Sequence, residues 1–283
     1  MFFNLLLAAA ICPLAGEWRL DASVSDEFDA PALDAAKWDD WCATFQGRRA
    51  AGKRGEKCET GFLFARKNVR VESGELVLTA RKMDESEDTV ENELRRFKPY
   101  SCAIVKSVAK SGYGYYEIRA KTMKACVSNA FWLYDPLSDA PQRKYKPGET
   151  SEEIDIFEVT GKADRGGKFD CTRIFYNTCH LVKTPYLEAV INGGMEKKPG
   201  MSFQTKTDFD FHDGYHVYGF LWTAEKMTWY LDGRKVAERE NSEYRRPLHV
   251  TFDCEIFPNW FGLPDDDDLP AEFRVDYIRV FRP

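Results

Sequence analysis

Short apolar runs, many of them alternating with polar residues, recur along the whole chain and are separated by turn-forming residues. Alternation with a period of two is typical of strands with one buried face, and unbroken apolar runs of this length fit fully buried strands. Ser73-Gly74 and Asp232-Gly233 each lie between two such runs, as hairpin turns do. We therefore predict an all-β antiparallel sandwich or jelly roll, built as one domain. The predicted strands lie within residues 68–81, 113–122, 130–136, 153–161, 215–223, 227–238, 248–257 and 273–281.

Two polar stretches interrupt this pattern. Residues 81–99 are highly charged and poor in β-branched side chains, which predicts a surface loop or a short helix. Residues 135–151 contain three prolines and predict a long loop that leads into the next strand. Long loops on a sandwich usually line its binding face. Trp222 and Trp229 lie inside regular strands and are expected in the core.

The strand after the second polar stretch carries three acids, Glu153, Asp155 and Glu158, among apolar residues. Side chains alternate faces along a strand, so Glu153 and Asp155 share one face while Glu158 points away from both. A regular strand would instead put Glu152 on the face of Glu158. One extra residue, inserted as a β-bulge at Ile156-Phe157, returns Glu158 to the face of the other two.

Acids seldom occupy a buried-looking strand unless they take part in chemistry. Two carboxyl groups about 5–5.5 Å apart suit a retaining glycosidase, in which one attacks the anomeric carbon and the other protonates the leaving oxygen. Glu153 is then the nucleophile and Glu158 the acid/base. Asp155 would hydrogen-bond Glu153 and let the trio share protons, so that Glu158 stays protonated near neutral pH. The alternative is a solvated acidic edge strand, and the spacing alone does not distinguish the two.

The overall composition narrows the class of protein. The chain has 283 residues, of which 43% are hydrophobic and 14% aromatic, so it can bury the large core of a sandwich. A net charge of −6 argues against a nucleic-acid partner. It leaves room for an anionic polysaccharide, because Arg48-Arg49, Arg95-Arg96 and Arg245-Arg246 could form local basic patches.

The first fifteen residues resemble a signal peptide, with a short apolar region followed by small residues near Ala15. They lack the usual positive n-region. This predicts a mature domain over residues 16–283 in a secreted or periplasmic protein, and no other apolar run is long enough to span a bilayer. Removal of the leader, which contains Cys12, leaves seven cysteines. Two local disulfides are plausible, Cys42–Cys58 and Cys171–Cys179, although most of the cysteines could instead be small buried residues. None shows the spacing of a zinc site.

The segments GYGYYEIRAK, SNAFWLY, EIDIFE, YHVYGFLWTAEKMTWYLDG and FRVDYIRVF resemble those of glycoside hydrolase family 16, in the same order. The likeness runs over nearly the whole mature chain. It implies a concanavalin A-like β-jelly roll with an open cleft suited to endo cleavage of a sugar chain. Glu153, Asp155 and Glu158 fall on the family's bulged motif, which is found in laminarinases, agarases, porphyranases and κ-carrageenases.

The same resemblance suggests substrate-binding residues. Trp132 matches an aromatic platform beside the scissile bond, where its indole offers a flat surface and an N–H group, while its neighbour Phe131 should face the core. His180 matches a substrate-contacting histidine of the galactan-cleaving members. Arg245 or Arg246 could contact sulfate, because planar guanidinium suits oxyanions. Trp260 is the best further subsite candidate, ahead of Trp41, Phe62 and Phe64, each of which more simply packs in the core.

The substrate implied by the resemblance is a β-1,4-linked red-algal galactan. Several segments look closest to κ-carrageenases, whereas NWFGLPDDDDLP is similar to agarases and porphyranases. The cysteine-bearing insert at residues 41–61 matches no member. A laminarinase, an endo-β-galactosidase of host glycans and a non-catalytic carbohydrate-binding protein remain alternatives. We expect a monomer that needs no catalytic cofactor, with a structural calcium ion allowed on the convex face. Asp265–Asp268 is expected to be a solvated turn rather than a cation site.

Overall fold

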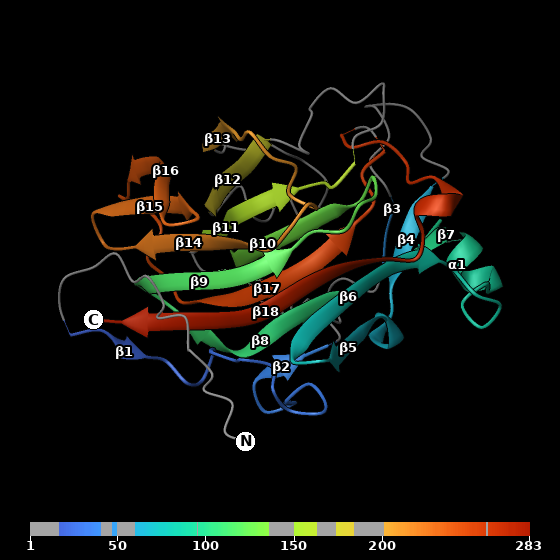
Figure 1. The fold of residues 1–283 in the computed structure, drawn as a ribbon, viewed down its shortest axis with the longest axis horizontal. Coiled ribbons are helices and arrows are strands. Elements are labelled where there is room, and N and C mark those ends of the chain that lie inside the picture. Colours follow the sequence, from blue (N-terminus) through green and yellow to red (C-terminus); the bar gives the residue numbers. More distant parts are fainter. Residues whose placement is uncertain are drawn as a thin grey trace, which may run out of the picture.

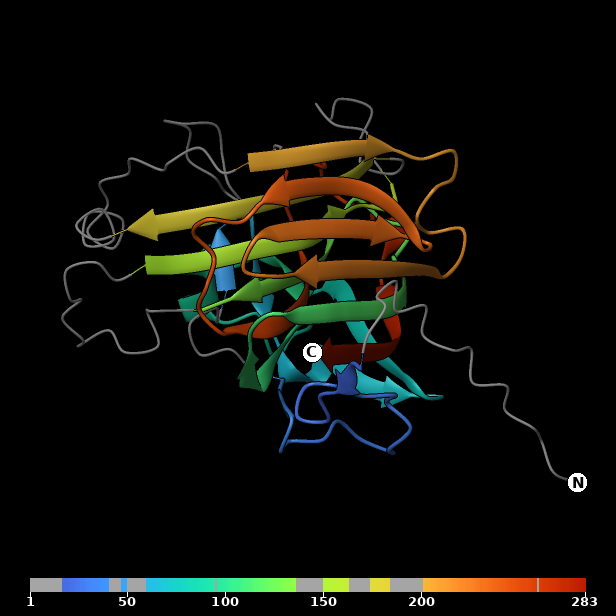
Figure 2. The same cartoon turned by 90° about the vertical axis from the view of Figure 1, so that its left-hand side faces the viewer.

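The computed structural model describes residues 17–40, 47–49, 60–94, 96–135, 150–162, 174–183, 201–258 and 260–283; within these, residues 47–49, 150–151, 174–183 and 201–202 are described as strand backbone only. Two β-sheets pack face to face (Figures 1 and 2). Nearly all strand pairs are antiparallel, which confirms the predicted sandwich. No helix in the described part of the chain is long and apolar enough to cross a membrane.

The larger sheet has eleven strands in the described residues, with the order β16-β15-β14-β9-β18-β6-β7-β4-β3, while β1 pairs with β18 and β5 with β6. Its strands are β1 (Arg19–Leu20), β3 (Gly47–Arg49), β4 (Gly61–Phe64), β5 (Val69–Glu72), β6 (Glu75–Lys82), β7 (Pro99–Cys102), β9 (Gly114–Lys121), β14 (His216–Trp222), β15 (Lys226–Leu231), β16 (Arg234–Glu240) and β18 (Ala271–Arg282).

The smaller sheet has the order β13-β12-β11-β10-β17-β8-β2. Its strands are β2 (Trp38–Asp39), β8 (Ile104–Ser111), β10 (Ser128–Tyr134), β11 (Thr150–Val159), β12 (Ile174–Lys183), β13 (Met201–Lys206) and β17 (Leu248–Glu255). The helical segments are short: α1 (Val90–Leu94) and the 3₁₀ turns η2 (Arg66–Asn68) and η4 (Asp266–Asp268).

Both predicted hairpins are present. Ser73 and Gly74 connect β5 to β6 with φ of 57° and 79°, and Asp232 and Gly233 connect β15 to β16 with φ of 49° and 75°. Two consecutive positive φ angles define the turn whose twist matches that of the flanking strands. Small or short polar residues adopt this conformation most readily, which is why these dipeptides were informative.

One strand pair departs from the antiparallel prediction. β4 and β7 run parallel, with Gly61 opposite Pro99 and Phe64 opposite Cys102. β4 also pairs with β3, which lies within the cysteine-bearing insert at residues 41–61. Sequence alternation does not report strand direction, and a parallel neighbour was therefore not foreseen.

The core lies between the sheets and is rich in aromatic side chains. Trp222, Trp229 and Phe131 are fully buried, as predicted. Phe62 and Phe64 are also buried, with ring centroids 5.3 Å apart, so they are core residues and not sugar platforms. Phe157 of β11 packs against Tyr218 of the opposite sheet with a centroid distance of 4.2 Å. This packing fixes the strand that carries the three acids.

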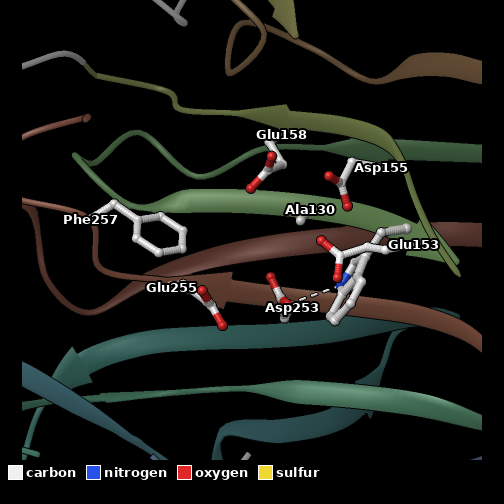
Figure 3. Close-up of a pocket in the computed structure, with 8 residues that line it drawn as sticks. Ala130, Glu153, Asp155, Glu158, Asp253, Glu255 and Phe257 are labelled. Atoms are coloured by element: carbon white, nitrogen blue, oxygen red, sulfur yellow. Dashed lines mark hydrogen bonds between the residues drawn. The ribbon is translucent and has the colours of Figure 1, made fainter. Parts of the chain in front are cut away.

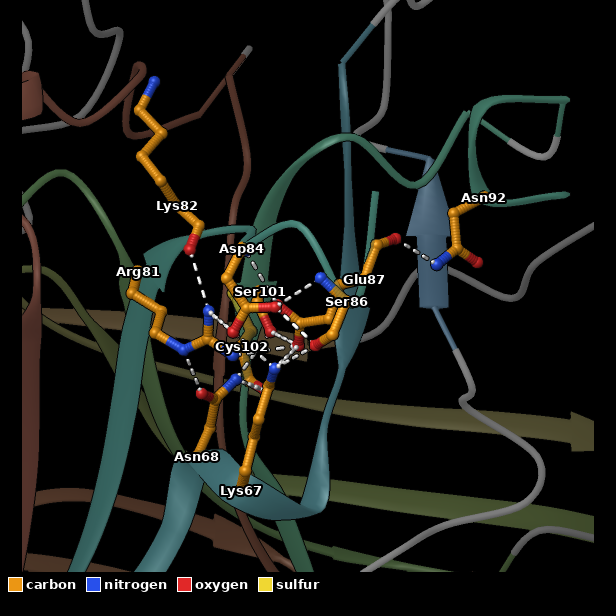
Figure 4. A network of polar contacts seen from close by, with 10 residues as sticks. All are labelled: Lys67, Asn68, Arg81, Lys82, Asp84, Ser86, Glu87, Asn92, Ser101 and Cys102. Atoms are coloured by element: carbon orange, nitrogen blue, oxygen red, sulfur yellow. Dashed lines mark hydrogen bonds and ion pairs between the residues drawn. The ribbon is translucent and has the colours of Figure 1, made fainter. Parts of the chain in front are cut away.

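The charged stretch at residues 81–99 contains α1, as predicted, but one of its acids is buried rather than solvated. Glu87 accepts hydrogen bonds from Arg81 Nη2 at 2.9 Å and Ser101 Oγ at 2.8 Å. Asn68 donates to the same Ser101 hydroxyl at 2.8 Å. Figure 4 shows how this network joins η2, the end of β6, the following loop and β7. It therefore fastens the part of the sheet in which β7 pairs with β4.

We expect Glu87→Ala to lower the free energy of unfolding by about 3 kcal/mol, because it leaves the Arg81 guanidinium without its buried partner. Urea denaturation measures the change. Glu85→Ala is the matched control, since Glu85 is exposed two residues away. Equal stability of the two variants would contradict a structural role for the network.

Candidate active site

The three acids of β11 lie on one face of the strand because of a β-bulge. Against β10, Trp132 is opposite Asp155 and Phe131 is opposite Phe157, so Ile156 has no partner. Against β12, the pairing likewise shifts between Asp155 and Glu158. Ile156 and Phe157 are both fully buried. The bulge predicted at Ile156-Phe157 is thus confirmed, and Glu153, Asp155 and Glu158 line one pocket.

This pocket lies on the outer face of the smaller sheet, over its central strands β10, β11 and β17. Eight described residues line it: Ala130, Trp132, Glu153, Asp155, Glu158, Asp253, Glu255 and Phe257. Figure 3 shows the β11 acids directed toward Asp253 and Glu255 of β17, with Phe257 at the end near Glu255 and Glu158. Five of the eight lining residues are carboxylic acids and none is a cation.

Asp253 and Glu255 were missed by the sequence analysis. The only signal was their spacing of two residues on a strand, which puts both on the face opposite buried Cys254. Nothing in the sequence showed that this strand lies two places from β11, with β10 between them. The second pair of acids is therefore a product of sheet order.

Burial and the surrounding acids raise the pKa of Asp155 well above its ordinary value. Burial is the largest cause, because Asp155 is only 4% exposed, and the negative charges of Glu158, Glu153, Asp253 and Glu255 add to it. Asp155 therefore holds a proton at a pH at which an ordinary aspartate is ionised. A protonated carboxyl between two glutamates can donate a hydrogen bond to a neighbouring carboxylate.

Trp132 lies in the predicted place, on the pocket face of β10 and almost wholly buried. Its indole N–H donates a 3.0 Å hydrogen bond to Asp253 Oδ2. The ring also lies beside Tyr134, with centroids 5.2 Å apart. The indole N–H that was predicted to face a sugar hydroxyl is thus bound to Asp253 instead.

The other predicted contacts are His180, Trp41 and Trp260. His180 lies opposite Glu153 in the β11–β12 register, and its side chain is outside the described residues, as is the whole of Trp41. Trp260 is half-buried and stacks on Phe261; its ring centroid is 5.9 Å from that of Phe257, so it adjoins the pocket without being one of its eight lining residues.

The two arginines predicted to bind sulfate are not among the lining residues. Arg246 forms a 2.6 Å ion pair with buried Asp135, which also binds Lys110. The backbone N–H groups of Arg245 and Arg246 donate to Glu152 Oε2 at 3.0 and 3.1 Å. Glu152 thus anchors this turn.

The described residues contain no group of three or more histidines, cysteines and acids that could hold a metal ion. Asp265 and Asp268 both bind Lys162, and Asp266 binds Lys82; Asp265 and Asp266 are exposed and Asp268 is half-buried. Cys102, Cys126 and Cys254 are buried free thiols. The two predicted disulfides, Cys42–Cys58 and Cys171–Cys179, involve residues 42, 58 and 171 outside the described residues, and residues 1–16 are also outside them.

A β-sandwich with a cleft-like row of acids beside an indole is the arrangement of a glycoside hydrolase, and the comparisons with known proteins agree. A family model described as "Beta-porphyranase A-D, GH16 domain" matches residues 18–283. The chain therefore belongs to glycoside hydrolase family 16, a family of enzymes that cleave glycan chains internally. This membership favours an enzyme over the alternative of a non-catalytic carbohydrate-binding protein.

Individual relatives include proteins named as porphyranases, a κ-carrageenase, a β-agarase and two glucanases. β-Porphyranase E of Zobellia galactanivorans is 29% identical over 288 residues, covering 95% of this chain and 89% of that protein. The κ-carrageenase of Pseudoalteromonas carrageenovora is 27% identical and covers 93% of this chain and 64% of that protein. The crystal structure of porphyranase B from Zobellia galactanivorans superposes with a TM-score of 0.74 at 20% identity, over 94% of this chain and 93% of that one. The shared fold is thus a family 16 jelly roll.

Proposed function

We propose that the protein is a retaining endo-hydrolase of β-1,4 bonds in a red-algal galactan, with porphyran or agarose preferred to κ-carrageenan. The observation that carries the chemistry is the bulge at Ile156, because it brings Glu153, Asp155 and Glu158 into one pocket. The porphyranase model and β-porphyranase E support a galactan substrate. We expect a secreted or periplasmic monomer acting on the polysaccharide chain.

In the proposed reaction Glu153 attacks the anomeric carbon while Glu158 protonates the leaving oxygen. Glu158 then takes a proton from a water molecule. This water attacks the anomeric carbon and releases the sugar from Glu153 with its original configuration. Asp155, whose raised pKa keeps it protonated, donates to the Glu153 carboxylate and orients it. As Glu153 loses its negative charge in the attack, the proton shared by Asp155 and Glu153 can shift toward Asp155.

The electrostatics of the pocket support a neutral sugar at the point of cleavage. Five carboxyl groups, not all of them ionised, and no cation face it among the described lining residues. A sulfate ester held there would meet the ionised acids as like charges, at a cost of at least about 1 kcal/mol. A sulfate on a sugar farther along the chain would not. This favours galactans whose cleaved residue is unsulfated.

The test is reducing-sugar release by the purified protein from porphyran, agarose, κ-carrageenan, furcellaran, laminarin and a mucin glycan. We expect the highest kcat/KM on porphyran or agarose and at least about tenfold less on κ-carrageenan, which corresponds to 1.4 kcal/mol of repulsion. Release from laminarin alone would show that the substrate is a β-1,3-glucan and not a galactan. Preference for κ-carrageenan would overturn the electrostatic argument.

A further inference from the structure

β17 supplies two buried carboxylates that cleavage of a glycosidic bond does not require. Asp253 is 3% exposed and Glu255 is 4% exposed, and both face the three acids of β11. Withdrawal of a carboxylate from water costs free energy unless the group gains a specific partner. Two additional buried acids beside three others therefore indicate that they have a role within the site itself.

Asp253 has such a partner in Trp132. The residue opposite Trp132 on β17 is Thr251, so Asp253 lies two positions further along the same face. From there Oδ2 accepts the indole N–H at 3.0 Å, while Tyr134 flanks the indole. A buried hydrogen bond to a charged acceptor allows one orientation of the ring. The stacking surface offered to a sugar is thus set by a residue 121 positions away in the chain.

Asp253 also faces the proton-sharing group. The titratable side chains that raise the pKa of Asp155 are Glu153 and Glu158 on its own strand and Asp253 and Glu255 on β17. On β10 the residue opposite Asp155 is Trp132, which does not titrate. On β12 the opposite residue is Thr178, and His180 lies opposite Glu153. Among the described residues, Asp253 is thus one of two acids of another strand, β17, whose charges act on this proton.

We propose that Asp253 is a positioning residue of the active site, which orients the Trp132 platform through its indole N–H and supplies negative charge that retains the shared proton on β11. The proposal rests on the proposed glycosidase function. It gives one side chain two separable effects, one on binding through the hydrogen bond and one on titration through the charge.

Two variants separate these effects. Asp253→Asn keeps an oxygen that can accept the indole N–H but removes the charge, whereas Asp253→Leu removes both at similar volume. We expect Asp253→Asn to retain KM within about twofold and to move both limbs of the kcat/KM profile to lower pH by about one unit. Asp253→Leu should show the same pH shift and raise KM by about tenfold, the fold-change expected for one lost hydrogen bond. Glu85→Gln, at an exposed site, should change neither.

A second measurement needs no substrate and so separates this proposal from the function itself. Because the folded-state pKa of Asp155 is raised, its contribution to stability is present below the unfolded pKa of about 3.9 and is lost as pH rises toward the folded pKa. Loss of the Asp253 charge lowers that folded pKa. The urea midpoint of Asp253→Asn should therefore increase relative to that of the wild type as pH rises from about 4 to 8.

The outcomes are distinct. An unshifted pH profile in Asp253→Asn, or a parallel pH dependence of the two urea midpoints, overturns the electrostatic part. An unchanged KM in Asp253→Leu overturns the part played by the hydrogen bond. If the wild-type protein cuts none of the polysaccharides, the proposed function fails, and the urea midpoints still test the charge at Asp253.

Discussion

Glu153→Gln should reduce hydrolysis of the preferred galactan by about four orders of magnitude or more, while oligosaccharide binding is retained. The amide has the shape of the carboxylate but cannot form the glycosyl-enzyme bond, and removal of a nucleophile leaves only the catalysis due to binding and orientation. Binding survives because the apolar surfaces of the site, Trp132 and Phe257, are unchanged. Reducing-sugar release measures the loss, and calorimetric titration with a tetrasaccharide measures the binding.

Glu85→Gln is the control for this substitution, because it makes the same chemical change on an exposed residue and should leave the rate unaltered. A wild-type-like rate in Glu153→Gln would overturn the nucleophile assignment. The stereochemistry gives an independent check, since a retaining enzyme releases the β-anomer first. Early appearance of the α-anomer in proton NMR of wild-type products would show inversion and remove Glu153 from the nucleophile's role.

Glu158→Gln should slow cleavage of the polysaccharide by about 10²- to 10⁴-fold, the usual contribution of a general acid. The loss should depend on the leaving group. A sugar hydroxyl leaves poorly without a proton, whereas a nitrophenolate leaves unaided, so a nitrophenyl oligosaccharide should keep a glycosylation rate within about tenfold of the wild type.

With that activated substrate the second step should become limiting, because Glu158 also deprotonates the water. We expect a burst of nitrophenol about equal to the enzyme concentration, followed by slow turnover. An equal loss of rate with good and poor leaving groups, and no burst, would show that Glu158 is not the acid/base. Trapping of the sugar on Glu153 by mass spectrometry would support both assignments together.

The bulge shows how far the sequence can be read locally. Glu153 and Glu158 are five positions apart, and a regular strand cannot put them on one face, so their shared chemistry required one extra residue between them. Ile156 and Phe157 are apolar and could both be buried, which identified them as the position of the bulge. The structure has the bulge there because the core accepts both side chains while the three acids stay on the outer face.

Contacts between distant residues were not readable in this way. Glu152 looked like one more acid of the strand, but it accepts the backbone N–H groups of Arg245 and Arg246 and fixes their turn. Arg246 looked like a free cation, but Asp135 binds it. Glu87 looked like a solvated charge, but it is the buried centre of a network that joins β6 and β7.

The sequence by itself determined the strands β5, β6, β9–β11 and β14–β18, the two hairpins, the bulge and the three acids of β11, because each depends on alternation or turn chemistry over a few neighbouring residues. The strands β8, β12 and β13 and the short strands β1–β4 and β7 lie outside the predicted ranges. The tertiary structure alone decided that β17 lies beside β10, that Asp253 and Glu255 complete an acidic pocket, and that Asp253 takes the indole N–H of Trp132. The physical reason is that strand order and long-range polar contacts depend on how the whole sandwich buries its apolar surface. A short stretch of sequence therefore does not predict them.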